Sequence, residues 1–191
     1  MFKTFIVAGT VALVGLIAVP QVRAAMDHTP EQIVIEKEAV QMIAQVEEVA
    51  RDVQYHADRL QDLARNVDVS LWSHYHHLDG IKALVNDGLR PALARLNAIE
   101  TQLPEWKQDS VARMIADAKR LADDTTSAYI AKENGGGIPA PMNDEYRRFV
   151  ADVASHATSL VKTADAAHSY ASAHLKASEA GLNIPKTRST N

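Results

Sequence analysis

Apolar residues recur along residues 35–67 with the spacing of a helix that buries one face. After Ile35 they follow at alternating steps of four and three residues, and His56 is the one polar residue in the series. Residues spaced in this way lie on one side of a helix, which is typical of the seam between packed helices. The predicted seam comprises Ile35, Ala39, Met42, Val46, Val49, Val53, His56, Leu60, Leu63 and Val67.

Capping residues mark where the first two helices begin. The sequence TPEQ at 29–32 combines a threonine cap, a proline in the first turn and a glutamine that closes a capping box. Ser70 or Asp68 is the expected cap of the second helix. Gly88 and Pro91 lie inside the apolar stripe of this helix, so a kink is predicted there.

Two further helices complete an all-α fold. Pro104 opens the third helix, and the glycine- and proline-rich stretch 133–143 ends it. Asn143 is expected to cap the fourth helix, which Gly181 ends. Four long helices with short connections predict an antiparallel, up-down-up-down four-helix bundle over residues 25–182.

The two ends of the chain are expected to lie outside this bundle. Residues 1–24 have the layout of a cleavable signal peptide: a basic start, an uncharged apolar run over 4–19, and small residues at Val22 and Ala24. A retained N-terminal membrane anchor is the alternative interpretation. Residues 183–191 are expected to form a disordered tail. The sequence therefore predicts an exported protein, which is periplasmic in a bacterium with two membranes and is otherwise secreted.

Charge and composition restrict the partners. Removing Lys3 and Arg23 with the signal peptide leaves 18 basic against 24 acidic residues, a formal net charge of −6. This acidic balance argues against nucleic acid as a partner, and no stable membrane insertion is expected after signal cleavage. The chain has no cysteine, which excludes disulfides, thiolate metal sites and covalently attached haem. Charged residues such as Glu36 and Glu47 are expected on the solvent faces of the helices.

The sequence motifs of several common enzyme classes are missing. No histidine is followed by glutamate, as in the zinc-protease helix, and no glutamate has a histidine three residues later, as in di-iron bundles. Neither a G-x-S-x-G nucleophile elbow nor a phosphate-binding glycine loop occurs. We therefore expect a non-catalytic module that binds a protein partner or associates with itself through a helix face.

A metal site is the main alternative, because the stretch WSHYHHLDG at 72–80 holds three histidines. His74 lies in the apolar stripe and His77 one helical turn later on its flank, so they are expected to point inward or sideways, while His76 is expected to face water. Antiparallel packing would bring this turn to a similar height as histidines of the first and fourth helices. Zinc, copper and nickel suit such ligands. The candidate ligands are His56, His74, His77, His156 and Asp124. The simpler interpretation is that these histidines are core-edge or solvated side chains and that no cofactor is bound.

Haem is a further alternative. Met42 on the first helix and His168 on the last fall at similar heights in an antiparallel bundle. A methionine from the first helix and a histidine from the last ligate haem in the soluble b-type cytochrome bundles of the periplasm. The chain resembles that family in its expected topology, its expected export and these two residues. The resemblance implies a non-covalent haem held by Met42 and His168.

Overall fold

The computed structural model describes residues 29–182, and these residues are all-helical, with no strand among them. The predicted signal peptide and the predicted C-terminal tail lie outside the described residues. The elements are α1 (Pro30–Leu63), α2 (Leu71–Ala83), the π-helix η1 (Leu84–Leu89), α3 (Arg90–Ile99), the 3-10 helix η2 (Glu100–Gln102), α4 (Glu105–Asn134), the 3-10 helix η3 (Ala140–Met142) and α5 (Asp144–Leu182).

The predicted caps start the helices as expected. The Thr29 hydroxyl accepts the backbone N–H of Gln32, and the Gln32 side chain accepts the backbone N–H of Thr29, so the capping box is complete. Ser70 caps α2 in the same way through its hydroxyl. The side-chain oxygen of Asn143 accepts the backbone N–H of Tyr146 at the start of α5. Local sequence therefore determines where the long helices begin.

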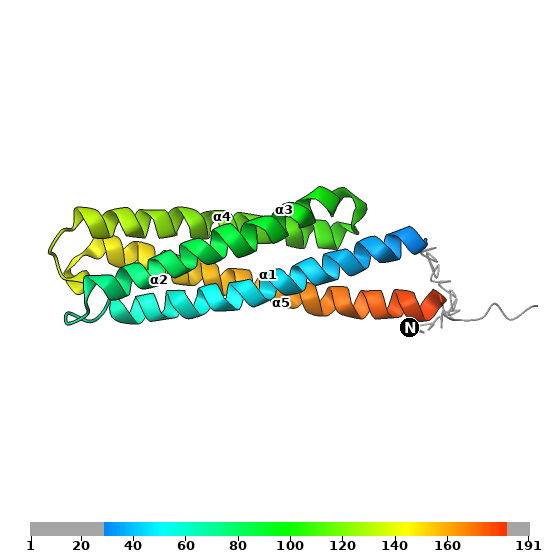
Figure 1. Cartoon of the computed structure of the whole chain (residues 1–191). Helices are drawn as coiled ribbons and strands as arrows, with labels where there is room; N and C mark the ends of the chain where they lie inside the picture. Colours follow the sequence, from blue (N-terminus) through cyan, green and yellow to red (C-terminus); the bar gives the residue numbers. More distant parts are fainter. Residues whose placement is uncertain (1–28, 183–191) are drawn as a thin grey trace, which may run out of the picture.

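The long helices lie side by side along one axis (Figure 1), and their contacts are uneven. α5 packs along most of α1 on one side and along most of α4 on the other. α2, η1 and α3 form one bent segment that packs on α1 but makes few contacts with α4. Within residues 29–182, none of the helices combines the length and apolar character needed to cross a membrane.

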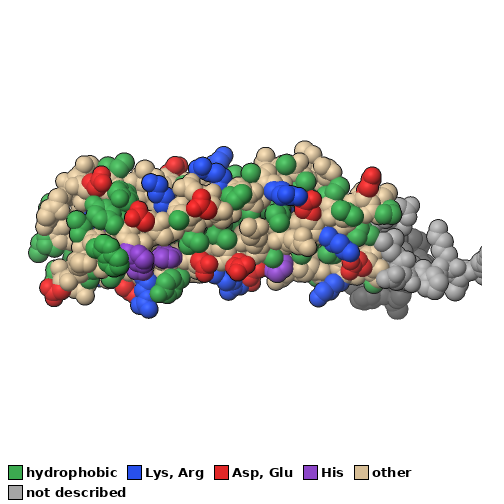
Figure 2. Space-filling model, in the orientation of Figure 1, with side chains coloured by type: hydrophobic (Ala, Val, Ile, Leu, Met, Phe, Trp, Pro, Cys, Tyr) green, Lys and Arg blue, Asp and Glu red, His purple; other side chains and the backbone are tan. Residues whose placement is uncertain are grey.

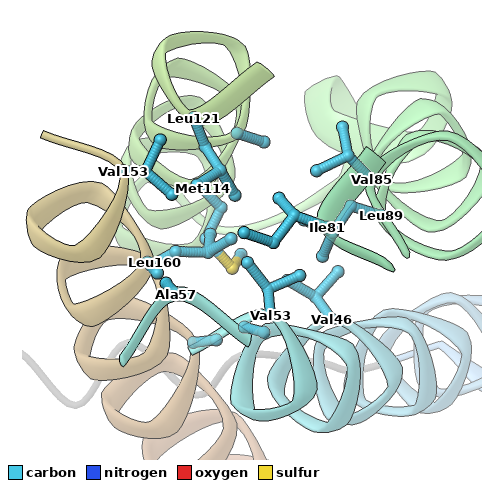
Figure 3. Packing of buried hydrophobic residues seen from close by; sticks show 14 of the residues in the cluster. Val46, Val53, Ala57, Ile81, Val85, Leu89, Met114, Leu121, Val153 and Leu160 are labelled. Atoms are coloured by element: carbon cyan, nitrogen blue, oxygen red, sulfur yellow. The ribbon is translucent and has the colours of Figure 1, made fainter. Parts of the chain in front are cut away.

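A continuous apolar core runs between these helices (Figure 3). Val46, Val53 and Leu60 are fully buried, as the predicted seam requires. Ala39 is also buried as predicted, but at three further turns the buried residue lies one position further along the sequence than predicted. Ile43, Ala50 and Ala57 are fully buried, whereas Met42, Val49 and His56 are only partly buried. The partly buried residues Met42, Val49 and His56 face the α2–η1–α3 segment. The fully buried residues Ile43, Ala50 and Ala57 complete the core.

The π-helix η1 includes Gly88, where the sequence predicts a kink. Here the backbone N–H of Arg90 bonds to the carbonyl of Val85, five residues earlier. A π-turn inserts one extra residue into a helix. His56 and Val49 of α1 pack against Gly80 and Gly88, respectively. The two glycines are eight residues apart, whereas the two residues of α1 are seven apart. A Cβ atom on Gly88 would lie 2.8 Å from a methyl carbon of Val49, so a side chain there would push the helices apart.

Candidate functional site

Three histidines gather on the surface where α1 meets α2 (Figure 2). The Nδ1 atoms of His56 and His77 are 3.0 Å apart. The ring centres of His56 and His77 are separated by 5.1 Å, and that of His76 lies 5.3 Å from His77 and 6.3 Å from His56. We call His56, His76 and His77 the histidine cluster. It joins one residue of α1 to two neighbouring residues of α2.

The close approach of α1 to α2 at Gly80 positions the histidine cluster. A Cβ atom at Gly80 would lie 2.6 Å from the Cε1 atom of His56, so the imidazole occupies the space that a side chain would take. Because glycine has no side chain, the His56 ring comes close enough to α2 for its Nδ1 atom to reach that of His77. Any larger residue would displace the His56 ring from its partner.

Aromatic side chains surround the cluster. The Trp72 indole stacks on the ring of His76, with 5.2 Å between centres and 12° between planes. The ring of Tyr55 meets His56 edge-on at 5.6 Å, and the guanidinium of Arg59 lies 5.6 Å from the centre of the Tyr55 ring. Trp72 is 72% exposed and Tyr55 is 56% exposed, so the site is open to solvent on its outer side.

Partial burial keeps two of these histidines neutral. It lowers the pKa of His56, and the neighbouring His76 lowers it further. Burial also lowers the pKa of His77, with His56 and His76 acting in the same direction. A neutral imidazole has one free nitrogen lone pair, which is the form that binds metals. At neutral pH, therefore, the His56–His77 pair shares one N–H between two ring nitrogens and has lone pairs available.

His74 does not join the cluster, although it lies in the same stretch of α2. It is 1% exposed, and its Nδ1 atom is 2.8 Å from the hydroxyl oxygen of Tyr146 on α5. Burial lowers the pKa of His74 to about 4, and the nearby charge of Lys132 acts in the same direction. Lys132 lies 5.3 Å from the centre of the Tyr146 ring. His74 is therefore a buried neutral side chain with a hydrogen-bond partner, away from the surface site.

His156 and Asp124 form a pair of their own between α5 and α4. The Nε2 atom of His156 is 3.3 Å from a carboxylate oxygen of Asp124. Burial raises the pKa of this carboxyl group, while His156 acts against that rise. The five candidate metal ligands thus fall into three separate places in the structure. No group of three or more histidine, cysteine or acidic residues within residues 29–182 is arranged to hold a metal ion.

Met42 and His168 face different neighbours of α1. The Nδ1 atom of His168 is 2.6 Å from a carboxylate oxygen of Glu47, whose other oxygen is 2.6 Å from the guanidinium of Arg51. Met42 instead lines a surface hollow together with Arg95 of α3. The structure therefore does not bring the two candidate haem ligands together. The Glu47 carboxylate orients His168 and lies between helices rather than on an open solvent face.

A buried charged cluster, which the sequence did not predict, joins α1, α4 and α5. Glu36 is 5% exposed, so its expected place on a solvent face is wrong. One of its carboxylate oxygens is 3.7 Å from the amine of Lys107, and the other is 3.4 Å from Nδ1 of His174. Lys107 is fully buried, and burial lowers its pKa against the opposing effect of Glu36. The burial of Glu36 could have been inferred from its position between the apolar residues Ile33 and Ala39 on one face of the helix.

The sequence pattern placed His74 beside His77 on the inner side of α2 and His76 toward water. His76 is exposed as expected, and its ring packs against His56 and His77, whereas His74 bonds to Tyr146. The useful signal was Gly80, which allows α1 and α2 to approach closely beside these rings. Comparison with known proteins adds no further assignment, since no family model, no curated protein and no solved structure matches this chain.

Proposed function

We propose that this protein is an exported, non-catalytic helical bundle that binds a divalent transition-metal ion at His56 and His77. The observation that carries the proposal is the 3.0 Å separation of their Nδ1 atoms. The two nitrogens come from different helices, and the packing at Gly80 holds them together before any ligand arrives. Ligands held in place in this way lose little freedom on binding.

The separation of the two nitrogens suits a copper-like ion. With metal–nitrogen bonds of about 2.0–2.1 Å, two ligands at a right angle lie about 2.9 Å apart, and two at a tetrahedral angle about 3.3 Å. The observed 3.0 Å, which is a hydrogen-bond distance between the two rings, lies near both values. Square-planar geometry with nitrogen ligands is typical of Cu²⁺ and Ni²⁺, and Cu²⁺ binds nitrogen sites most tightly of the common divalent ions. Copper is therefore the first metal to test, followed by nickel and zinc.

The remaining coordination positions are open to water and to His76. The His76 ring rests on Trp72, and rotation of its side chain toward His77 would supply a third nitrogen. The partly exposed outer side leaves room for a further ligand from solvent. Such a site would carry or buffer an ion, and no residue near it completes the arrangement of a known catalytic motif.

Titration calorimetry of the folded protein with Cu²⁺, in a buffer that does not bind metals, tests the proposal. The wild-type chain should bind one ion per chain, and His56→Ala and His77→Ala should each weaken binding at least tenfold. His156→Ala is the matched control, because it removes a histidine that is paired with Asp124 elsewhere. Equal binding by the wild type and His56→Ala, or no binding at all, overturns the proposal.

The bundle topology and export belong to the same proposal. The side-by-side helices and short connections support an antiparallel, up-down-up-down arrangement of four helical segments, with α2, η1 and α3 counted as one. The signal-like pattern of residues 1–24 supports export. N-terminal sequencing of protein recovered outside the cytoplasm should give a chain that begins at Ala25. A chain that retains Met1 would contradict cleavage.

Self-association is the second candidate function, and exposed apolar side chains beside the cluster favour it. Tyr55, Val67, Leu71 and Trp72 are between 48% and 72% exposed, and they come from α1, α2 and the connection between them. A contiguous apolar surface on a soluble domain often marks a protein contact. Sedimentation analysis should show a dimer that Trp72→Ser dissociates. A monomer at all concentrations would contradict self-association.

A further inference from the structure

The bundle is open along the side where the α2–η1–α3 segment faces α4. Two adjoining hollows of about 420 and 400 Å³ follow this seam. They share the side chains of Val85, Arg90 and Ala122, so they form one interrupted groove rather than two separate sites. We call it the α3–α4 groove. It lies on a different seam from the histidine cluster, which is between α1 and α2.

The π-helix η1 forms part of the wall of the α3–α4 groove. Val85 lines both hollows, and Leu89 lines the larger one. π-turns are uncommon and occur frequently at functional sites, because the extra residue re-aims the side chains around it. The backbone N–H of Arg90 bonds to the carbonyl of Val85 in this π-turn, and both residues line both hollows.

The floor of the groove is apolar, and its rim carries positive charge. Leu93 and Ile115 contribute to the floor of the larger hollow, and Arg90 and Lys119 are its charged members. No carboxylate lines that hollow, and within residues 29–182 neither cation forms an ion pair. Asp123 lines the smaller hollow beside Lys82. An apolar floor with unpaired cations at its edge suits a ligand with an apolar chain and an anionic head.

The size of the hollows is that of a small-molecule site. Ligand sites in proteins typically measure about 300–1,000 Å³, and both hollows fall within that range.

We infer that the α3–α4 groove binds a single-chain anionic amphiphile, such as a fatty-acid carboxylate. The carboxylate lies between the guanidinium of Arg90 and the amine of Lys119. The hydrocarbon chain lies on the floor formed by Leu89, Leu93 and Ile115.

The test compares two amphiphiles that share one chain and differ in the charge of the head. Sodium dodecanoate and dodecyltrimethylammonium are titrated into the full folded protein by calorimetry, below their micelle-forming concentrations. The wild-type chain should bind dodecanoate at least tenfold more tightly than the cation. Equal binding of the two, or no binding of dodecanoate, overturns the inference, and the second result would leave the groove to a partner of another class.

Variants then locate the ligand. Arg90→Glu combined with Lys119→Glu should weaken dodecanoate binding at least tenfold and reverse the preference between the two heads. Arg120→Glu with Lys162→Glu makes the same change of charge outside both hollows, and it should leave binding unchanged. Ala94→Phe, which is placed at the exposed edge of the larger hollow, should block the chain without disturbing the core. Dodecanoate binding that survives both Ala94→Phe and the groove charge reversal overturns the assigned site. His56→Ala, which tests the metal site, should not affect it.

Discussion

The inner and outer faces of α2 place histidines from the same helical turn in opposite surroundings. His74 on the inner face is 1% exposed and bonded to Tyr146, and burial lowers its pKa to about 4. His77, three residues later, is partly exposed and lies 3.0 Å from the Nδ1 atom of His56. The first histidine has a permanent protein partner in the core. The second shares a proton with another histidine at the surface, where a metal ion could replace that proton.

This difference shows how surroundings rather than residue type determine the role of a histidine. A buried polar group must be hydrogen-bonded, and the Tyr146 hydroxyl supplies the bond for His74. A partly exposed pair can exchange its shared proton for another ligand at small cost in core packing. We therefore expect changes on the inner face of α2 to alter stability, and changes on its outer face to alter binding.

The largest expected effect comes from placing a charge on each face of α2. Ile81 is fully buried, so Ile81→Asp should lower the free energy of unfolding by about 3–5 kcal/mol. Ala83, two residues later, is exposed, and Ala83→Asp should cost less than about 1 kcal/mol. Urea unfolding followed by circular dichroism measures both. Equal losses would show that α2 does not present these two faces to core and solvent.

The pH dependence of stability should come mainly from the inner face. The unfolded His74 side chain takes up a proton near pH 6.5, whereas the folded one resists it until about pH 4. The contribution of His74 to stability is therefore fully present above about pH 6.5. As the pH drops toward 4, the free energy of unfolding falls by up to about 3 kcal/mol. The pKa values of His56 and His77 are lowered too and act in the same direction.

Urea unfolding at pH 7.5 and at pH 4.5 measures this loss. His74→Gln has no titrating group at this position and keeps an amide that can bond to Tyr146. It should lose distinctly less stability between the two pH values than the wild type does. A decline as steep in the variant as in the wild type would assign the acid sensitivity to other groups.

A smaller effect should follow from removing one hydroxyl group in the core. Tyr146→Phe takes away the partner of His74 and leaves a buried ring nitrogen without its hydrogen bond. The expected loss is about 1–3 kcal/mol in the free energy of unfolding. Tyr55→Phe is the matched control, because Tyr55 is 56% exposed beside the outer face. Losses of the same size for both tyrosines would contradict the contrast between the faces.

The smallest effect should come from His76 on the outer face. His76→Ala removes an exposed ring, so the free energy of unfolding should change by less than about 0.5 kcal/mol. The fluorescence of Trp72 should shift, because its indole loses the imidazole stacked on it. A loss of stability above about 1 kcal/mol would mean that the histidine cluster holds α1 against α2. That result would make the cluster structural instead of a binding site.

Local features were predictable from the sequence. The caps at Thr29, Ser70 and Asn143 depend on residues within one turn of each other, and the structure has all three. The burial of Val53 was also predictable, because apolar residues recur on both of its neighbouring turns. Which residues beside the line of Val46, Val53 and Leu60 are buried could not be predicted, because apolar side chains occur on both sides of that line. The neighbours decided it: α5 and the core cover Ala57, while α2 covers His56 only in part.

The sequence by itself determined an all-helical chain, the starting points of its long helices and the presence of several histidines on them. Only the tertiary structure decided which histidines meet. His74 lies in the apolar stripe of α2 and His77 on its flank one turn later, and the rotation of α2 in the bundle buries the first and leaves the second partly exposed. Gly80 then brings α1 close enough for His56 to reach His77. The physical reason is that helix formation depends on nearby residues, whereas the pairing of side chains depends on the rotation and spacing of helices, which the whole core sets together.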